Sequence, residues 1–458
     1  MNKKSMILVF AAGLLASCGG TATPTTSTPA GGNTSVATST ETNPFANYDL
    51  TAPITVWNDA KEEAVIKDVV KKWNDAAPAN NKLNVTFKAV SEADGGSTLG
   101  KDPKVKDYPS LVAIADDQLA SLAQKQYIAG LSDYFKNKVV AADTEIVVTS
   151  SSYENTLYGF PITNDNGYFL YYNSKKLTAG DVKSLETIIS KASATGTFAI
   201  DIDNGWYGNS FYQAIAGTTS LKWEMKQVGD TVKDVYPTLD WDKPECVKAA
   251  EYLHSFLGPA YTAGSIIDAD DSAIVGGFGE KANVIAAVSH INNYKAVIEA
   301  NPDVKCVELP SFTVDGKAHH MASFSGSKTY VVNKYATKGE QLAAMVLGDL
   351  LTNEYAQTKR FAERNTIPCN KAAAAACTDL NEGQRALLAQ ANYAAVQATS
   401  AGASYWNVGA AMEKALFDGQ VADSEKKESG EIDWAKFLKN ECDILRSGVT
   451  PETEAEAK

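Results

Sequence analysis

The sequence predicts an α/β protein, and three observations support this class. Short apolar strands alternate with amphipathic helices from about residue 49 onward, which is typical of sheets covered by helices. The pattern after residue 338 is almost entirely helical. The chain has 458 residues, of which 44% are hydrophobic and 21% are charged, so we expect two or three domains with ample cores.

The first part of the folded region predicts strand, helix, strand, strand and helix in that order. Asp59 is expected to cap the first helix, because apolar residues recur at helical spacing from Val65 to Trp73. The second helix is expected to begin at Leu119. Apolar runs, or alternation of apolar and polar residues, mark the three strands at 54–57, 85–89 and 111–115.

The rest of the chain continues this mixture and then becomes helical. Pro244 is expected in the first turn of a helix that Asp242 caps and that runs to Phe256. Further strands are predicted at 198–202, 282–288, 304–309 and 329–332. Further helices are predicted at 340–352, 353–363, 382–398, 405–417 and 434–445.

The N-terminus predicts export and lipid attachment. Two lysines precede a ten-residue apolar run, 6–15, which is too short to cross a hydrocarbon core about 30 Å thick and is typical of a signal peptide. Residues 15–18 (LASC) resemble the bacterial lipobox. This resemblance implies removal of a signal peptide, 1–17, and acylation of Cys18 on the outer face of the cell membrane. A plain secretory signal with an incidental cysteine is the alternative.

Both ends of the mature chain are predicted to be unfolded. Segment 18–47 is interpreted as a flexible, lipid-anchored tether, because it is rich in Thr, Ser, Gly and Pro and cannot bury enough apolar surface to fold. The tail 448–458 is polar and is predicted to be disordered. No later run approaches 18 apolar residues, so no second membrane anchor is expected.

Charge and cysteine content narrow the class of protein further. There are 42 Lys and Arg against 55 Asp and Glu, a net charge of −13, so the basic surface of a nucleic-acid binder is not expected. Five cysteines follow Cys18, and their spacing matches no metal site. Export permits disulfides, and Cys369 with Cys377 is one conceivable pair. Buried free thiols are the favoured alternative.

Motifs for cofactors and catalysis are weak. Residues 95–101 (GGSTLGK) resemble a phosphate loop, but Asp102-Pro103 follows where a hydroxyl and a helix are needed, so a mobile surface loop is predicted. The pair His319-His320 would point to opposite faces of a strand. The acidic segment 268–271 offers weak calcium ligands and is otherwise a solvated loop. We expect no cofactor, no metal and no enzymatic activity.

Three segments carry the polar side chains or the aromatic rings that a sugar site requires. Carboxylates and amides accept and donate hydrogen bonds to hydroxyls, while aromatic faces pack on the apolar faces of sugar rings. Asp117, after the strand 111–115, is also interpretable as a helix cap. The candidate residues are Asp117 and Gln118, then Asn204, Trp206 and Tyr207, and finally Tyr405 and Trp406.

At this point the chain resembles the extracellular solute-binding proteins of sugar ABC transporters, and among them the maltose/maltodextrin-binding proteins. The resemblance keeps one order from about residue 54 to residue 420. It is carried by the lipobox and tether and by segments 54–59, 109–118, 158–161 (YGFP), 171–173 (YYN), 326–333 (GSKTYVVN), 351–354 (LTNE), 359–361 (KRF) and 367–368 (IP).

This resemblance implies a type II periplasmic-binding-protein-like fold, with two discontinuous α/β lobes joined by crossing hinge segments. Lobe 1 is expected to comprise 48–162 and 326–366, and lobe 2 to comprise 163–325 and 367–447. The implied protein is a monomeric receptor that delivers a sugar to membrane permease subunits. The implied ligand-binding residues are Asp59, Lys61, Asp117, Asn164 or Asp165 near the hinge, Asn204, Trp206 and Trp406.

The chain departs from the family pattern at four places. Gln118 replaces an expected arginine, Ile114 an expected aromatic residue, and Asn204 an expected acid. Residues 289–291 (SHI) replace a Gly-Pro-Trp that supplies a stacking ring. The missing ring predicts a short cargo of about two to four sugar units. A different cargo, such as a polyol, another glycan or a peptide, and an exported carbohydrate-active enzyme are the alternatives.

Overall fold

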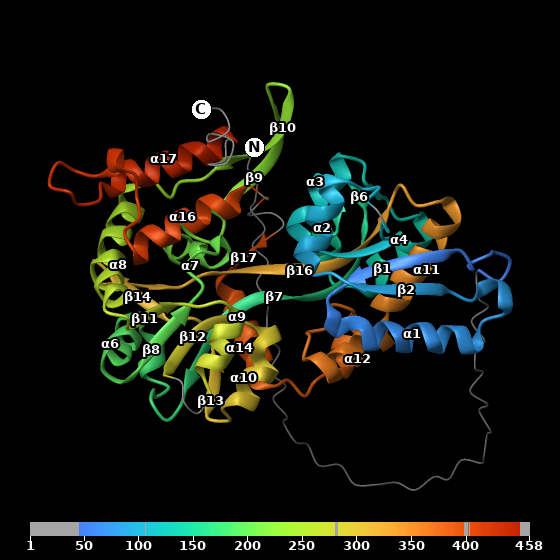
Figure 1. Ribbon diagram of the computed structural model, residues 1–458, viewed down its shortest axis with the longest axis horizontal. Coiled ribbons are helices and arrows are strands. Elements are labelled where there is room, and N and C mark those ends of the chain that lie inside the picture. Colours follow the sequence, from blue (N-terminus) through green and yellow to red (C-terminus); the bar gives the residue numbers. More distant parts are fainter. Residues whose placement is uncertain (1–44, 106, 280–282, 398–401, 403, 449–458) are drawn as a thin grey trace, which may run out of the picture. The chain divides into compact units, whose positions relative to one another are not determined.

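A computed structural model describes residues 45–105, 107–279, 283–397, 402 and 404–448. The described residues from Phe45 onward belong to one compact unit, and their elements confirm the α/β class (Figure 1). Its main sheet has eleven strands, with the order β11-β8-β12-β7-β16-β3-β1-β2 along its path. The strands β13, β17 and β4 pair with β7 or β16 beside this path. The predicted signal peptide, Cys18 and most of the tether lie outside the described residues, as does nearly all of the tail.

The strands and helices have the following bounds. The main-sheet strands are β1 (Pro53–Asn58), β2 (Asn84–Ala89), β3 (Leu111–Ala115), β4 (Ile128–Ala129), β7 (Gly159–Asn173), β8 (Thr197–Ile200), β11 (Ile266–Asp268), β12 (Val284–His290), β13 (Val304–Val307), β16 (Ser323–Asn333) and β17 (Ala394–Val396). Three two-stranded sheets pair β5 (Ser152–Tyr153) with β6 (Thr156–Leu157), β9 (Lys222–Val228) with β10 (Thr231–Thr238), and β14 (Ser311–Val314) with β15 (Lys317–His320). The helices are α1 (Glu63–Ala76), α2 (Glu92–Lys101), α3 (Leu119–Gln124), α4 (Asp133–Ala142), α5 (Glu145–Ser150), α6 (Leu185–Thr195), α7 (Gly205–Ala216), α8 (Pro244–Thr262), α9 (Asp271–Gly277), α10 (Tyr294–Ala300), α11 (Lys338–Thr352), α12 (Glu354–Arg364), α13 (Lys371–Ala376), α14 (Glu382–Gln390), α16 (Tyr405–Phe417) and α17 (Trp434–Ser447).

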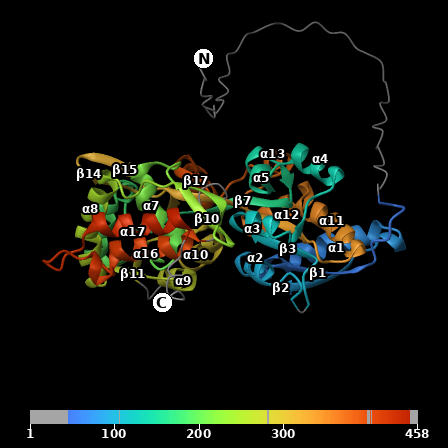
Figure 2. The same cartoon turned by 90° about the horizontal axis from the view of Figure 1, so that it is seen from above.

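Two long strands, β7 and β16, run through both halves of the unit and pair antiparallel with each other. We call the half built on β1–β3 lobe 1 and the half built on β8, β11 and β12 lobe 2 (Figures 1 and 2). The pairing of β7 with β16 changes register on both sides of Lys328. The two-lobe solute-binding fold expected from the resemblance is therefore the fold observed.

Each lobe has a core on both faces of its part of the sheet. Alternate residues of a strand point to opposite faces. In lobe 1, Leu111 and Ala113 join the cluster with α1 and α11, while Val112 and Ile114 join the cluster with α2 and α3. Strand β7 alternates in the same way in lobe 2, where helices again cover both faces. Fully buried strands such as β3 therefore read as continuous apolar runs in the sequence.

Three local predictions were wrong, because tertiary contacts override local pattern. The helix predicted at 382–398 ends at Gln390, and the chain then forms β17 beside β16. The glycine-rich segment predicted as a loop is helix α2, whose Gly95 packs directly on Val112 and Ala113 of β3. Asp242 does not cap α8 and instead pairs with Arg446 of α17.

The segment that follows the expected lobe boundary at residue 366 includes α13. The segment that ends in α13 packs on lobe 1, since the backbone N–H of Thr144 donates to the carbonyl of Cys369 and Lys371 reaches the carbonyl of Ala141. All five cysteines after Cys18 are buried and free, including Cys369 and Cys377. No helix in the described ranges is long and apolar enough to cross a membrane.

Candidate functional site

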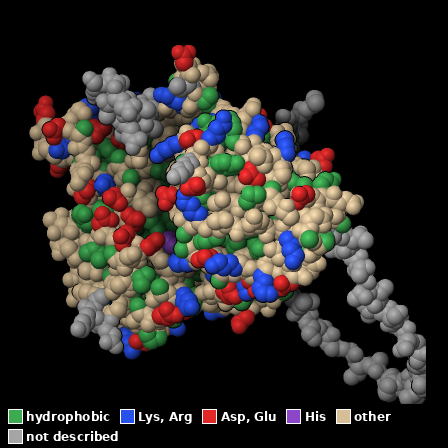
Figure 3. Space-filling view, turned by 45° about the vertical axis from the view of Figure 1, so that its right-hand side comes forward, with side chains coloured by type: hydrophobic (Ala, Val, Ile, Leu, Met, Phe, Trp, Pro, Cys, Tyr) green, Lys and Arg blue, Asp and Glu red, His purple; other side chains and the backbone are tan. Residues whose placement is uncertain are grey.

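A cavity of about 1040 Å³ lies between the lobes and is the candidate site. Lobe 1 lines it with residues that follow β1, β2 and β3, and lobe 2 lines it from α7, α9, α16 and the end of β12. Figure 3 shows one face of the molecule, where a hollow separates two masses and acidic side chains gather beside it. In open α/β sheets, ligands bind outside the carboxyl ends of strands, and the lobe 1 wall occupies that position.

Asp59 and Lys61 stand at the lobe 1 end of the cavity. The carboxylate of Asp59 accepts a hydrogen bond from the backbone N–H of Lys61 at 2.8 Å. Asp59 therefore caps a short turn and not the predicted helix, because the N-cap position of α1 is Glu62 and no side chain caps α1. This cap closes the short 3₁₀ turn Ala60–Glu62 that leads into α1. The ammonium of Lys61 makes no ion pair within the described ranges. Both side chains line the cavity.

Asp117 forms a direct hydrogen bond between the lobes. The indole N–H of Trp406, on α16, donates to Oδ2 of Asp117 at 3.1 Å. Asp117 is buried, and this burial is the main cause that raises its pKa to about 6. The helix-cap interpretation is wrong, because Gln118 occupies the N-cap position of α3 and no side chain caps that helix. Asp117 therefore faces the cavity and lobe 2.

Trp206 is the second tryptophan of the cavity, at the start of α7. Its indole N–H donates to Oε1 of Gln397 at 2.9 Å. Its ring packs edge to face on Tyr168 and Tyr207, with ring centroids 4.8 and 5.1 Å away. Asn204 caps α7, since its side-chain oxygen accepts the backbone N–H of Trp206 at 3.2 Å. The two indoles are thus fixed by their N–H groups and remain half-buried at the cavity wall.

Gln118 lines the cavity, and its side-chain amide is hydrogen-bonded within lobe 1. Its Nε2 donates to the carbonyl of Ala93 on α2 at 2.9 Å. The side chain lies over Gly96, where an added Cβ would meet Oε1 of Gln118 at 1.5 Å. The glycine that imitates a phosphate loop in the sequence therefore makes room for a side chain of the cavity wall.

Four residues predicted to bind ligand do not line the cavity. Tyr207 and Tyr405 lie in the main core of lobe 2 and are 3% and 0% exposed, because both fill the space between the sheet and the helices. Asp165 is buried in the crossing strand, where its carboxylate accepts the backbone N–H of Ile367 at 2.8 Å. Asn164 lies beside it on β7 and is also absent from the cavity wall.

Several charged residues of the cavity were missed by the sequence analysis. Lys328, on β16, pairs with Glu92 on α2 at 3.1 Å. Arg364 pairs with the buried Glu62, which also accepts from Arg360 at 2.7 Å. The partners of these pairs are more than 200 residues apart in the chain. No local pattern marks such pairs, so only the folded structure reveals them.

His290 is the last residue of β12 and lines the cavity. Its Nε2 lies 2.6 Å from Oδ2 of Asp271, and its Nδ1 accepts the backbone N–H of Asn292 at 3.2 Å. Asp271 in turn accepts from Asn293 at 2.8 Å and from Ser289 at 3.2 Å. A group of hydrogen-bonded polar side chains therefore lies beside Trp206, and the ring centroids of His290 and Trp206 are 6.4 Å apart.

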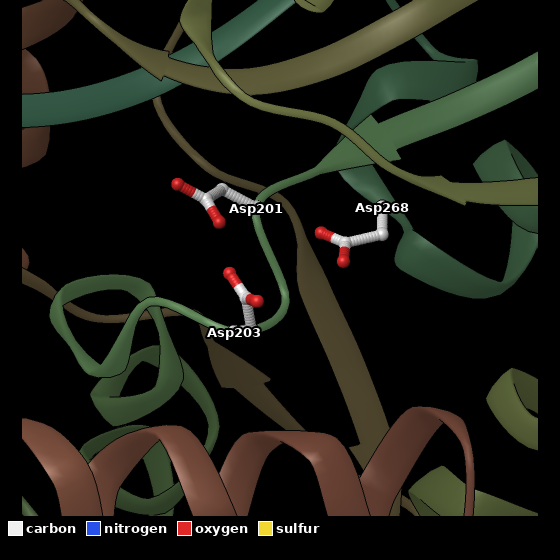
Figure 4. Close-up of side chains that lie close together, drawn as sticks. All are labelled: Asp201, Asp203 and Asp268. Carbon is white, nitrogen blue, oxygen red and sulfur yellow. The ribbon is translucent and has the colours of Figure 1, made fainter.

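The acidic loop considered for calcium does not act as one group. Asp270 caps α9 and Asp271 pairs with His290. Asp268 instead approaches Asp201 and Asp203 at the carboxyl ends of β8 and β11 (Figure 4). Each of these three carboxylates has a protein partner. Asp268 accepts from the backbone N–H of Ile202, Asp201 accepts from the side chain of Asn204, and Asp203 pairs with Lys414. Burial raises the pKa of Asp201 to about 6. The cluster therefore gives no independent sign of a metal.

The fold and the cavity together define a two-lobe binding protein that takes a solute between its lobes. A family model described as bacterial extracellular solute-binding protein matches residues 68–391. The chain therefore belongs to the bacterial extracellular solute-binding protein family. No curated protein sequence matches the chain significantly.

Solved structures agree with this fold. The chain is similar to the maltodextrin-binding protein MalE1 of L. casei BL23 without ligand, with 20% identity, a TM-score of 0.65, and coverage of 86% of this chain and 99% of that one. It is similar to the maltose-maltodextrin binding protein of Alicyclobacillus acidocaldarius, with 19% identity, a TM-score of 0.64, and coverage of 85% and 100%. MalX from Streptococcus pneumoniae in complex with maltopentaose gives 16% identity, a TM-score of 0.67, and coverage of 86% and 100%.

Proposed function

We propose that this protein is the substrate-binding lipoprotein of an ABC importer and that its cargo is a sugar. The observation that carries the proposal is the pair of half-buried indoles, Trp206 and Trp406, in one polar cavity with the carboxylate of Asp117. Aromatic rings pack on the apolar faces of sugars, and a carboxylate accepts their hydroxyl protons. The solved structures named above, which are maltodextrin- or maltose-binding proteins by description, support the same cargo class.

The charges of the cavity favour a neutral cargo. Lys328 pairs with Glu92, Arg364 with Glu62, and His290 with Asp271. A strongly charged ligand could bind these groups only by breaking existing pairs. Lys61 lines the same cavity and makes no ion pair among the described residues, so it remains available to a hydroxyl oxygen. A hydroxyl-rich neutral molecule can instead bind the remaining lone pairs and N–H groups at the cavity surface. We infer an oligosaccharide of maltodextrin type, about two to four units long, because residues 289–291 (SHI) lack the stacking ring that the resemblance implies there.

A panel of cargoes tests this function. Maltose, maltotriose, maltohexaose, a polyol and a tripeptide are each added to the protein during thermal unfolding. Binding raises the free energy of unfolding by RT ln(1 + [L]/Kd), about 2.7 kcal/mol at a hundredfold excess over Kd. We expect a clear rise in Tm with a short maltodextrin and a smaller rise in the variant Asp117→Ala, because loss of the carboxylate should weaken binding by about 1–3 kcal/mol. A rise only with the polyol or the tripeptide would assign another cargo.

The same panel separates a receptor from an enzyme. A carbohydrate-active enzyme would shorten maltohexaose over hours, whereas a receptor leaves its length unchanged. Chromatography of the sugar after incubation shows which occurs. If the wild type forms shorter products and Asp117→Ala does not, the protein is a hydrolase and not a receptor.

The lipid anchor and the permease complete the proposed function. Acylation of Cys18 would hold the monomeric receptor on the outer face of the membrane, close to the permease subunits that accept the cargo. Cys18→Ser should leave the protein uncleaved or release it from the membrane fraction. Unchanged acylation and fractionation of that variant would exclude Cys18 as the anchor.

A further inference from the structure

Gln397 connects the cavity to the crossing strands. It follows β17, which pairs in parallel with β16, and the last pair of that ladder is Ser325 with Val396. Gln397 therefore lies beside Gly326, where an added Cβ would meet its Oε1 at 2.9 Å. Its side chain is only 3% exposed, yet it reaches the cavity wall. No sequence pattern indicated this residue, since β17 was predicted as part of a helix.

One amide oxygen of Gln397 accepts two donors from different elements. The indole N–H of Trp206, on α7, donates to Oε1 at 2.9 Å. The side-chain amide of Asn166, on β7, donates to the same oxygen at 3.4 Å. Asn166 is itself the register partner of Gly326 on β16. Trp206 is thus tied, through one buried oxygen, to the point where both crossing strands meet.

The indole N–H groups of the two cavity tryptophans bind acceptors in different parts of the fold. The N–H of Trp406 donates to Asp117 in the opposite lobe, so the length of that hydrogen bond depends on the distance between the lobes. The N–H of Trp206 donates to a group carried by the crossing strands. Trp206 is therefore held by a group beside the crossing strands, and the side chain of that group, Gln397, also hydrogen-bonds the carboxylate of Asp117 on lobe 1.

We propose that Gln397 is a positioning residue, which fixes the indole of Trp206 as a sugar-stacking surface by anchoring it to the hinge strands. This inference rests on the proposed sugar-binding function. Gln397 acts through Trp206 and not by contact with the cargo. Removing the acceptor leaves the indole N–H without its partner in a partly buried site, so the ring reorients toward water.

The first test observes Trp206 without any cargo. The chain has seven tryptophans, and the indole N–H resonance of Trp206 is assigned by its loss in Trp206→Phe. In Gln397→Met, which keeps the length of the side chain but has no strong acceptor, this resonance should shift upfield. The resonances of the tryptophans other than Trp406, whose acceptor Asp117 also hydrogen-bonds Gln397, should stay in place. Gln397→Asn, which is too short to reach, should give the same shift if the Met variant folds poorly. The exposed Gln227→Met is the matched control.

The second test is a double-mutant cycle with maltotriose as the probe. Gln397→Met should weaken maltotriose binding about tenfold in the wild-type background. In the Trp206→Phe background, where no N–H exists to be held, the same change should alter Kd less than twofold. An equal loss in both backgrounds would mean that Gln397 acts on the sugar directly or through its hydrogen bond to Asp117. That result would overturn the proposal, as would an unshifted Trp206 resonance. Failure of wild-type protein to bind maltotriose would contradict the proposed cargo alone, because the resonance test needs no sugar.

Discussion

The two walls of the cavity are built in different ways. The lobe 1 wall comes from turns that follow strands, and its residues Asp59 and Asp117 are charged. Behind it lies a buried ion network in which Glu62 binds Arg360 and Arg364. The lobe 2 wall comes from the first turns of α7 and α16, and it rests on packed aromatic rings such as Tyr405. Substitutions behind the first wall should therefore disturb charge balance, and those behind the second should disturb packing.

The largest expected effect is on the ion network behind the lobe 1 wall. Glu62 is 2% exposed and Arg360 is 0% exposed. Glu62→Ala leaves the guanidinium of Arg360 buried without its carboxylate, and breaking a buried pair from one side costs about 3–5 kcal/mol. Urea unfolding should show this loss. The exposed pair of Lys175 with Asp303 is the control, where Lys175→Ala should cost less than about 1 kcal/mol. Equal losses of unfolding free energy in Glu62→Ala and Lys175→Ala would contradict the expected difference between the buried and the exposed ion pair.

The next effect concerns the aromatic wall. Trp206→Ala and Trp406→Ala each remove a ring that is expected to bury the apolar face of one sugar unit, worth about 1–2 kcal/mol at roughly 25 cal/mol per Å². Each variant should bind the identified sugar about tenfold more weakly or worse. Without ligand, each should melt close to the wild type, because the rings are half-buried. A core tryptophan such as the fully buried Trp241 would instead cost about 3–5 kcal/mol when truncated.

These two walls also differ in how far the sequence could predict them. Strand β3 and helix α16 were predicted with the bounds that the structure has, because a buried apolar run and a helical repeat are local patterns. Asp117 and Trp406 were singled out by residue type and by their place after a strand or at a helix start. Their hydrogen bond joins positions 289 residues apart, and it depends on how the lobes meet.

Errors arose where tertiary structure decides a residue's role. The aromatic residues of segments 204–212 and 405–406 look alike in the sequence, but Tyr207 and Tyr405 fill the core while their neighbours Trp206 and Trp406 face the cavity. Local composition does not reveal which side of a helix meets a second helix. Gln397 was missed for a related reason, since β17 exists only because β16 supplies a strand for it to pair with.

The third prediction is a pH dependence that comes from the lobe 1 wall. Burial, together with the neighbouring charge of Asp117, raises the pKa of Asp116 to about 7 from an ordinary 3.8. The folded state therefore binds this proton more tightly than the unfolded chain does. Its stabilising contribution is complete below about pH 4 and is lost as the pH rises through about 7, at no more than about 1.4 kcal/mol per pH unit.

Urea unfolding between pH 5 and pH 8 measures this slope. Asp116→Asn cannot ionise, so the fall in the free energy of unfolding with pH should be shallower in that variant. Asp117, whose pKa is also raised, retains part of the slope. The matched lobe 2 variant Asp201→Asn should flatten the profile less, because the pKa of Asp201 is raised only to about 6. An unchanged profile in Asp116→Asn would mean that this carboxyl does not hold its proton in the folded state.

The smallest expected effect separates the cap of α7 from the ring that follows it. The side-chain oxygen of Asn204 accepts the backbone N–H of Trp206, and replacing such a cap by alanine costs about 1 kcal/mol. Asn204→Ala should therefore lower Tm by only about one degree in a chain of this length, while Trp206 stays anchored through Gln397. Asn204→Asp keeps the cap and adds a charge beside Asp201 and Asp203, so it serves as the matched variant. Asn204→Ala could instead weaken sugar binding as strongly as Trp206→Ala, with Asn204→Asp leaving it unchanged. In that case the cap, and not the amide of Gln397, positions the ring of Trp206. The lobe 2 wall would then depend on helix geometry more than on packing.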